Sequence, residues 1–308
     1  MLAIGVDLGG TNLRVALIND DYEVLTKTME SSAENVIDLM VDLIDDIITP
    51  EVTGIGIGVA GVIDRKRVLV HRSPNLEAVE GVDFGEVIGK RFSLPLYIEN
   101  DANAYAIGEK KAGAGKRFSS FVLLTLGTGI GGGVVYRERL LDIAAEFGHV
   151  TVEAGGVSCP CGNSGCLESY ASARAMTSMT VESLESGTES LLKECCNGNI
   201  YKITPGDIYN CALEGDGLAR EILKTAGRYL GIGIANLVNT FSPEAVILGG
   251  GLTGAWNIYV EEARREAEKR AFPELFEGVG IIPAESGDDA GVIGSASLVF
   301  DNLRNEQA

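Results

Sequence analysis

The chain has 308 residues, of which 45% are hydrophobic, so it is long enough for two domains of ordinary size with sizeable cores. Its 44 acidic residues outnumber 25 basic ones, and the formal net charge is −19. This balance opposes binding to nucleic acid or to an anionic membrane, because neutralising phosphates needs a basic face.

The N-terminal stretch and the cysteines indicate the cellular compartment in which the protein is expected. The N-terminal stretch MLAIGVDLGG has neither a basic start nor a long apolar run, so it does not resemble a secretory signal. The sequence contains no run of about eighteen apolar residues, so no membrane span is predicted. Cys195, Cys196 and Cys211 lie outside the cysteine cluster described below, and spare thiols are typical of a reducing compartment. We therefore expect a cytoplasmic protein with no nucleic-acid or membrane partner.

The first twenty residues predict a strand, a glycine turn and a second strand. Apolar runs at 2–6 and 15–18 form the two strands. The backbone N–H groups of such a turn and a threonine hydroxyl can face a phosphate, and an aspartate at the strand end can hold hydrated Mg²⁺. An ordinary hairpin with a solvated aspartate is the alternative. The residues concerned are Asp7, Gly9, Gly10 and Thr11.

Two further strands are predicted in the first half. GIGIGVAG (54–61) alternates glycine with Ile, Val or Ala, which indicates a central strand against which another element packs closely. LPLYI (94–98) predicts a strand that delivers Asn100 and Asp101 at its carboxyl end, where α/β sheets carry functional groups. The alternative for Asp101 is a helix N-cap. Asn75 lies in the preceding loop.

The second half opens in the same way as the first. After a polar stretch at 110–120, which we interpret as a domain crossing, an apolar strand at 121–126 leads into a glycine turn at 127–133. This turn contains Gly127, Thr128, Gly129 and Gly131. A long apolar helix is predicted at 217–241, and the strand at 245–251 ends in a third glycine turn with Gly250 and Gly251. The repetition indicates an internal duplication of one α/β unit.

The stretch EFGHVTVEAGGVSCPCGNSGCLE (146–168) contains one of the chain's two histidines and three of its six cysteines. His149, Cys159, Cys161 and Cys166 offer the nitrogen and sulfur donors that a tetrahedral zinc ion prefers, and four protein ligands make such a site structural. Glu146 and Glu168 flank the cluster. The alternative is three unrelated thiols in a loop.

These motifs together resemble the ROK family of sugar kinases. The resemblance covers essentially the full chain and rests on DLGGTNLR (7–14), END (99–101), LGTGIGGG (126–133), EFGH (146–149), CPCGNSGCLE (159–168) and LGGG (248–251). It implies an α/β fold of two actin-like (ribonuclease H-like) ATPase domains, with sugar and ATP in a cleft between them. We place the small domain at 1–112, completed by a C-terminal helix at 290–308, and the large domain at 113–289, with the zinc loop at 146–168.

The same resemblance implies roles for individual residues. Asp101 would be the general base that takes the proton from the sugar 6-hydroxyl as the γ-phosphoryl group of ATP is transferred in line. His149 would ligate zinc with one ring nitrogen and touch the sugar with the other. The implied sugar ligands are Asn75, Asn100, Asp101, Glu146, His149 and Glu168. The residues implied to bind ATP or its Mg²⁺ are Asp7, Gly9, Gly10, Thr11, Gly127, Thr128, Gly129, Gly131, Gly250 and Gly251.

Glucose-specific members of the family typically combine EFGH with the cysteine-rich loop, but N-acetylmannosamine kinases do so too. We expect a glucokinase of glycolysis and carbohydrate metabolism, assembled as a dimer or tetramer. An N-acetylmannosamine kinase and a broad-specificity hexokinase or fructokinase are the alternatives. Because the glycine turns lie outside the zinc loop, metal loss is expected to weaken sugar binding before it weakens nucleotide binding.

Two non-catalytic classes compete with this prediction. A sugar-responsive repressor of the same family carries an additional winged-helix domain of roughly 70 residues before the first hairpin. Here that hairpin begins at residue 7, so we expect no such domain. A silent sugar-binding regulator would lose the base or the phosphate turns, and both are present in the sequence.

Overall fold

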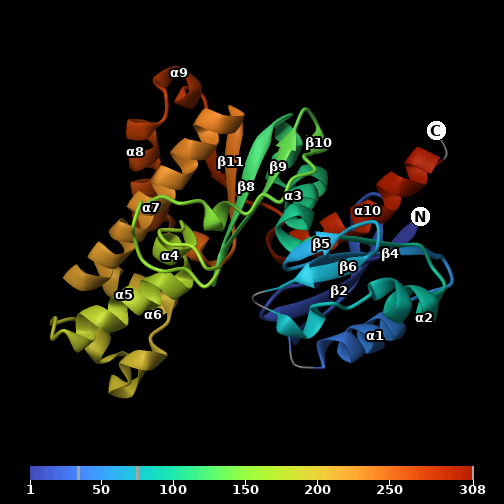
Figure 1. Ribbon diagram of the computed structural model, residues 1–308, viewed down its shortest axis with the longest axis horizontal. Helices are drawn as coiled ribbons and strands as arrows, with labels where there is room; N and C mark the ends of the chain where they lie inside the picture. The colour runs from blue at the N-terminus through green and yellow to red at the C-terminus, as the bar shows by residue number, and fades with distance from the viewer. Residues whose placement is uncertain (33–34, 74–75, 307–308) are drawn as a thin grey trace. The chain divides into compact units, whose positions relative to one another are not determined.

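The computed structural model describes residues 1–32, 35–73 and 76–306 (Figure 1). It divides into two compact units. Unit 1 contains Met1–Phe121, Gly133–Ala145 and Ala284–Ala308, and unit 2 contains Val122–Gly132 and Glu146–Pro283. The helices pack against two five-stranded mixed sheets, so the expected α/β class is confirmed.

The sheet of unit 1 has the order β3-β2-β1-β4-β7. β1 and β2 form the predicted antiparallel hairpin, whereas β1, β4 and β7 run parallel to one another. Parallel neighbours bring their carboxyl ends to one edge of the sheet, which is where the candidate residues lie. The elements are β1 (Leu2–Leu8), β2 (Asn12–Asn19), β3 (Val24–Ser31), α1 (Val36–Ile47), β4 (Val52–Val59), β5 (Val62–Asp64), β6 (Leu69–Arg72), α2 (Lys90–Phe92), β7 (Leu96–Asn100), α3 (Asp101–Ala112) and α10 (Ala290–Glu306).

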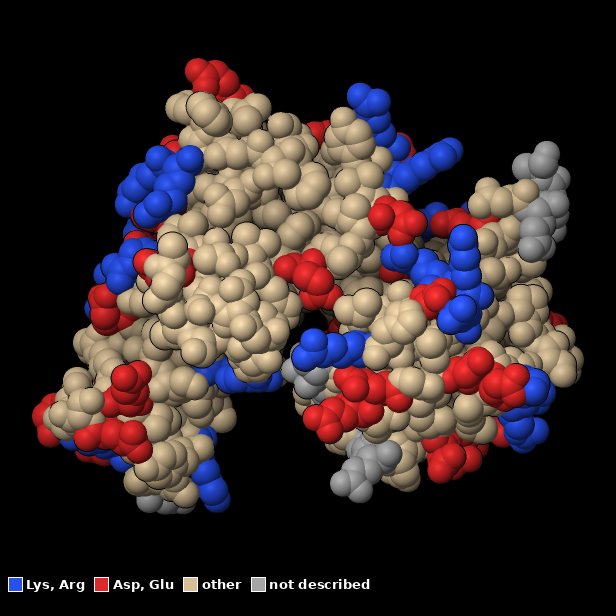
Figure 2. Space-filling model, viewed as in Figure 1, with Lys and Arg blue, Asp and Glu red and all other residues tan. Residues whose placement is uncertain are grey.

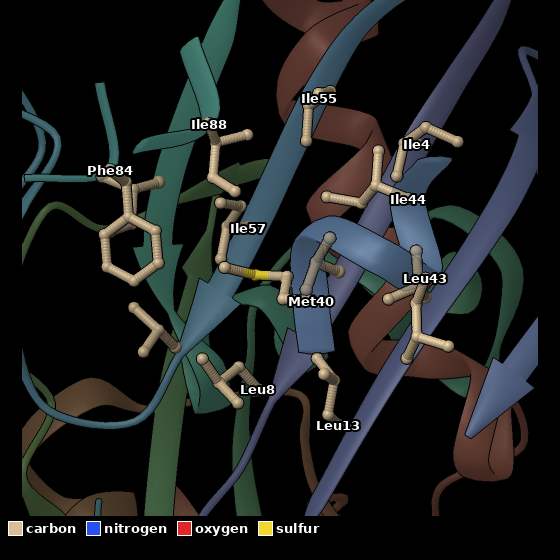
Figure 3. Close-up of a cluster of buried hydrophobic side chains, with 14 of the residues drawn as sticks. Ile4, Leu8, Leu13, Met40, Leu43, Ile44, Ile55, Ile57, Phe84 and Ile88 are labelled. Atoms are coloured by element: carbon tan, nitrogen blue, oxygen red, sulfur yellow. The ribbon is translucent and has the colours of Figure 1, made fainter. Parts of the chain in front are cut away.

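Alternating side chains of the strands build a separate core on each face of this sheet. On one face, Met40, Leu43 and Ile44 of α1 pack against Ile4 and Ile57, as Figure 3 shows. The apolar residues of α1 recur at helical spacing, so burying them on the sheet stabilises the helix. The other face carries small side chains and receives α10.

Glycines allow α10 to approach the strands at backbone distance. A Cβ built on Gly5 would lie 2.1 Å from the carbonyl oxygen of Val292, and one on Gly56 would lie 1.8 Å from that of Ser295. The glycine alternation at 54–61 therefore reflects close helix packing, as the sequence predicted. Gly294 of α10 approaches the Ala104 carbonyl of α3 in the same way.

The second sheet has the order β10-β9-β8-β11-β12. In both sheets the first three strands along the chain lie in reverse order, and the next two follow on the other side of the first. This shared order agrees with the predicted duplication. The elements are β8 (Phe121–Leu126), β9 (Ile130–Tyr136), β10 (Arg139–Leu140), α4 (Glu168–Ala171), α5 (Ala173–Glu185), α6 (Pro205–Leu213), α7 (Gly217–Phe241), β11 (Ala245–Gly249), α8 (Glu261–Arg270), α9 (Pro273–Phe276) and β12 (Gly280–Pro283).

The long helix α7 spans the residues that the sequence predicted for it. Its Gly227 and Gly231 pack against the backbone of Tyr259 and Ala263, and a Cβ on either glycine would lie 2.5 Å from the carbonyl oxygen of its neighbour. Gly233 contacts Leu167, which follows the cysteine cluster. The helix therefore supports the segment that carries the cluster.

None of the helices in the described ranges is long and apolar enough to cross a membrane. On the face shown in Figure 2, Lys and Arg side chains lie in several small groups with acidic side chains beside them. Within the surface of either unit seen on that face, these groups do not join into a continuous basic stripe of the kind that binds a phosphate backbone.

Candidate functional site

The first group of candidate residues lies at the carboxyl edge of the sheet in unit 1. Asp7 stands near the end of β1, and Asn100 ends β7. β4 lies between these strands and pairs Gly58 with Asp7 and Val59 with Asn100. Since neighbouring strands are about 4.8 Å apart, the two strand ends are about 10 Å apart. The sheet register thus places the predicted magnesium residue and the predicted base on one edge.

Asp7 is held in an ion pair. Arg14 Nη1 donates to Asp7 Oδ2 at 3.1 Å, and Arg14 Nη2 donates to Asp288 Oδ1 at 3.3 Å. Burial raises the pKa of Asp7, and the Arg14 guanidinium opposes the rise without cancelling it. A second cation beside Asp7 would offset the remaining cost of ionising this buried carboxylate. Asp7 therefore fits a position near Mg²⁺.

The turn after β1 is fixed through its carbonyl groups. Gly9 N–H donates to the Asn12 carbonyl at 3.0 Å, and the Ser32 hydroxyl donates to the Gly9 carbonyl at 2.8 Å. Ser32 N–H donates to the Thr11 carbonyl at 2.9 Å. Gly10 and Thr11 are exposed at the tip. With these carbonyls engaged, the tip can present N–H groups and a hydroxyl to an anion.

Asn100 caps helix α3. Its Oδ1 accepts from the N–H groups of Ala102 and Asn103, and its Nδ2 donates to the Gly61 carbonyl at 3.2 Å. The N-cap at this position is therefore Asn100, and Asp101 is the first helical residue, where a carboxylate interacts favourably with the helix dipole. Asp101 is partly exposed at the sheet edge.

An ion pair between the buried Glu99 and the exposed Arg65, which sequence reasoning missed, supports this corner. Glu99 is 4% exposed, and Arg65 binds both of its carboxylate oxygens at 2.7 Å, through Nε and Nη2. Glu99 Oε1 also accepts from Asn100 N–H at 2.8 Å and from Asn103 Nδ2 at 3.1 Å. A two-point contact of this kind fixes orientation as well as position, so it immobilises the start of α3.

The second group of candidate residues belongs to unit 2 and begins with the glycine turn after β8. Gly127 N–H donates to the Gly129 carbonyl at 3.0 Å, and Ala173 N–H donates to the Gly127 carbonyl at 2.9 Å. Gly131 N–H donates to Thr125 Oγ1 at 3.2 Å. Thr128 is exposed at the tip. The turn is thus tied at its base and open at its tip, as an anion-binding turn must be.

The third glycine turn lies beside this one. β11 neighbours β8 in the sheet, and a Cβ on Gly250 would lie 2.4 Å from the Leu126 carbonyl oxygen. Gly250 has φ +89°, so a side chain here would also be strained. Gly251 follows at the start of a short 3₁₀ helix, Gly251–Ala255. The two turns therefore form one glycine-lined edge.

The cysteine cluster assembles as predicted. The potential ligand atoms of His149, Cys159, Cys161 and Cys166 lie within 4.8 Å of one another. His149 Nδ1 is 3.7 Å from Cys159 Sγ, and Cys161 Sγ is 3.7 Å from Cys166 Sγ. Zinc–sulfur bonds of about 2.3 Å in a tetrahedron separate the sulfurs by about 3.8 Å. The donor set and its spacing therefore fit a structural Zn²⁺.

The pKa shifts of the cysteine thiols also fit a bound Zn²⁺. Burial opposes ionisation of Cys159, but hydrogen bonds from Cys161, Ser169 and His149 lower its pKa to about 7. Burial together with the neighbouring sulfurs of Cys159 and Cys161 raises the pKa of Cys166 to about 12. Three crowded sulfurs cannot all be thiolates unless a cation shares their charge, and a bound Zn²⁺ would do so.

Of the carboxylates that flank the cluster, Glu146 lies close enough to His149 and to Glu168 to interact with both. Partial burial raises the pKa of Glu146, the His149 imidazole lowers it, and the Glu168 carboxylate adds to the rise. Because His149 turns Nδ1 toward the sulfurs, its Nε2 is available to another partner. Glu168 also accepts a hydrogen bond from Ile130 N–H in the glycine turn, at 2.8 Å.

This last contact changes one expectation. The sequence places the turn at 127–131 outside the zinc loop, but Glu168 at the end of the loop and Ala173 beyond it both bond to the turn. Neither contact has a local sequence signal, because 38 residues separate Ile130 from Glu168. Asn75, the remaining predicted sugar ligand, lies outside the described residues.

Comparison with known proteins defines the class. The family model described as "ROK family" matches residues 3–302. A glucokinase of Thermotoga maritima is 36% identical over 310 residues, which cover 97% of this chain and 98% of that protein. A xylose repressor of Caldicellulosiruptor bescii is 33% identical, and the match covers 97% of this chain and 78% of the repressor.

A solved structure supports the same family assignment. A ROK family glucokinase from Streptomyces griseus, in complex with glucose and AMPPNP, superposes with a TM-score of 0.83 and 30% identity, covering 98% of this chain and 100% of that one. The chain belongs to the ROK family, as its motifs predicted, and it is similar to both glucokinases and repressors of that family.

Proposed function

We propose that the chain is an ATP-dependent sugar kinase that phosphorylates glucose at O6. The observation that carries the proposal is the placement of Asp101 at the carboxyl end of β7, directly after an N-cap supplied by Asn100. On either side of Asp101, Asn100 N–H and Asn103 Nδ2 donate to Glu99, whose carboxylate is bound by Arg65. The similarity to glucokinases supports the substrate class.

Asp101 acts in this proposal as the general base. It accepts the proton of the sugar 6-hydroxyl as that oxygen attacks the γ-phosphorus of ATP in line, and ADP leaves. Position matters more than basicity here, because phosphoryl transfer depends mostly on alignment and on charge stabilisation. The ion pair behind the start of α3 provides that alignment.

The proposed sugar ligands are Asn75, Asn100, Asp101, Glu146, His149 and Glu168. Asn100 has one amide hydrogen directed to Gly61 and a second that remains for a sugar hydroxyl. His149 would offer Nε2, with its Nδ1 on the metal side. The role of a bound Zn²⁺ would be to fix this imidazole and the loop around it, since four protein ligands leave no open position.

The proposed nucleotide site uses both sets of glycine turns. The N–H groups at Gly9, Gly10 and Thr11 and those of the 127–131 turn would receive phosphate oxygens, and Gly250 and Gly251 would lie against the nucleoside. Mg²⁺ would neutralise charge on the β- and γ-phosphates, held by Asp7 through water. The proposed domains are 1–112 with 290–308 and 113–289, whereas the first compact unit also includes residues 113–121, 133–145 and 284–289.

A substrate panel tests the proposal. Purified protein with Mg²⁺-ATP is offered glucose, mannose, fructose, N-acetylmannosamine and xylose, and ADP release is coupled to an optical signal. Glucose should give the highest kcat/KM. A higher kcat/KM for N-acetylmannosamine or fructose would favour one of the alternative specificities. Absence of turnover with every sugar would refute the proposed kinase activity.

A sugar-binding regulator is the second candidate, because xylose repressors are among the relatives. Its expected behaviour is sugar binding by calorimetry without ADP release. The same panel therefore separates the two functions.

A further inference from the structure

Glu168 makes a contact that a sugar ligand does not need. Its Oε2 accepts the Ile130 N–H at 2.8 Å, at the end of the glycine turn proposed to hold phosphates. A Cβ on Gly129 would lie 2.4 Å from the same oxygen, so the carboxylate lies directly against the turn. The turn thus takes part of its shape from a side chain outside it.

The second oxygen of Glu168 remains available. Among the described residues, Oε1 accepts no hydrogen bond, and the side chain is half-buried. Glu146 lies near enough to both Glu168 and His149 for its charge to interact with theirs. Oε1 therefore belongs to the proposed sugar site, whereas Oε2 belongs to the turn.

We propose that Glu168 is a positioning residue that couples sugar binding to the phosphate turn. The inference rests on the proposed function and assigns Glu168 a role beyond contact with the sugar. A sugar hydroxyl that donates to Oε1 would immobilise the carboxylate, and Oε2 would then hold Ile130 N–H and the turn in place. A nucleotide that binds afterwards would order fewer groups and bind more tightly. Coupling of this kind is reciprocal, so the nucleotide would tighten sugar binding by the same factor.

Three variants separate the two oxygens. Glu168→Ala removes both contacts. Glu168→Gln keeps a carbonyl oxygen for Ile130 N–H and replaces the other oxygen with an amide that cannot accept a hydrogen bond. Glu146→Ala is the matched control, because it alters the same sugar site and has no recorded bond to the turn. Calorimetry gives the Kd of a non-hydrolysable ATP analogue with and without saturating glucose, and amide hydrogen exchange follows Ile130.

We expect Glu168→Ala to speed exchange at Ile130 at least tenfold and to weaken the analogue about tenfold, since a hydrogen bond to a charged acceptor is lost. Glu168→Gln should keep most of the protection at Ile130 and lose the effect of glucose on the analogue. Glu146→Ala should weaken glucose and leave exchange at Ile130 unchanged.

Unchanged exchange and unchanged analogue binding in Glu168→Ala, with weakened glucose, would overturn the inference and leave Glu168 as a sugar ligand. A thermal melt of each variant separates a local effect from unfolding. If the wild-type protein binds the analogue with no influence of glucose, this inference fails alone. If the wild-type protein does not bind the analogue at all, the proposed function fails with it.

Discussion

At the scale of single residues, two carboxylates close together in the chain have different surroundings. Glu99 is buried and bound to Arg65, whereas Asp101 is partly exposed at the start of α3. The sequence identified Asp101, because strand ends in α/β sheets carry functional groups. It did not identify Arg65, which lies 34 residues away in a loop and has no pattern that links it to Glu99.

Replacing Asp101 with Asn tests its assignment as the base. Asn is nearly isosteric but cannot take a proton, so turnover should fall by about 10²–10⁴-fold while glucose binding persists. Steady-state kinetics and calorimetry measure the two effects. Asp45→Asn, which alters an exposed ion pair with Arg91, is the control and should keep wild-type turnover. More than about a tenth of the activity in Asp101→Asn would rule out the base.

Arg65→Ala tests the support behind the base. The change leaves the Glu99 carboxylate buried without its partner, so we expect a loss of about 2–3 kcal/mol in unfolding free energy. Turnover should fall as well, because Glu99 also orients Asn100 and Asn103. Urea titration compares this variant with Arg91→Ala, whose exposed pair should contribute less than about 1 kcal/mol. Equal losses in the two variants would contradict the support role.

At the scale of elements, the loop from Glu146 to Glu168 joins three functions. It carries the cysteine cluster, it contributes three of the six proposed sugar ligands, and it is tied through Glu168 to the glycine turn after β8. Residue types and spacing were enough to predict the cluster, since the donors lie within one short stretch. The tie to the turn depends on tertiary packing and could not be predicted from spacing.

Metal analysis tests the cluster directly. We expect one zinc per chain in protein prepared without added zinc, and much less in Cys161→Ser, because a hydroxyl is a poor replacement for a thiolate ligand. Cys195→Ser, which alters a thiol outside the cluster, is the control and should keep the full content. A content near zero in the wild type would show that the thiols do not hold zinc.

Loss of the metal should weaken both ligands. In Cys159→Ala the glucose Kd is expected to rise about 10–100-fold, as it does when the support of a site is disrupted. Because Glu168 reaches Ile130, the nucleotide Kd should rise as well, by a smaller factor. Separate titrations with glucose and with a non-hydrolysable ATP analogue decide this. An unchanged nucleotide Kd would restore the original expectation that the turn is independent of the loop.

The contact between α10 and the first sheet gives a prediction about packing. Gly56→Ala places a methyl group 1.8 Å from the Ser295 carbonyl oxygen, so strand and helix must separate. Overpacking of this kind should cost about 3 kcal/mol. Gly89→Ala is the matched control, since its nearest neighbour would be a Leu96 methyl at 3.8 Å. Urea midpoints followed by circular dichroism should differ clearly, and similar midpoints would contradict the close packing.

At the scale of the whole molecule, the repeated strand order of the two sheets agrees with the duplication that the glycine turns indicated. Long periodic elements such as α7 were predicted with correct ends, because apolar spacing and the proline that follows define them. Family membership follows from motifs spread over the chain and from the matched relatives. Family membership alone does not imply catalysis, because a xylose repressor is 33% identical to this chain over 97% of its length.

One measurement tests the central claim most directly. Wild-type protein is incubated with Mg²⁺-ATP and glucose, and phosphorus NMR identifies the products. The account predicts ADP together with a phosphate ester on O6 of glucose, and neither product when ATP is omitted. Glucose that remains unmodified, with the same result for the other hexoses and for N-acetylmannosamine, would contradict the account and leave a sugar-binding regulator as the better description.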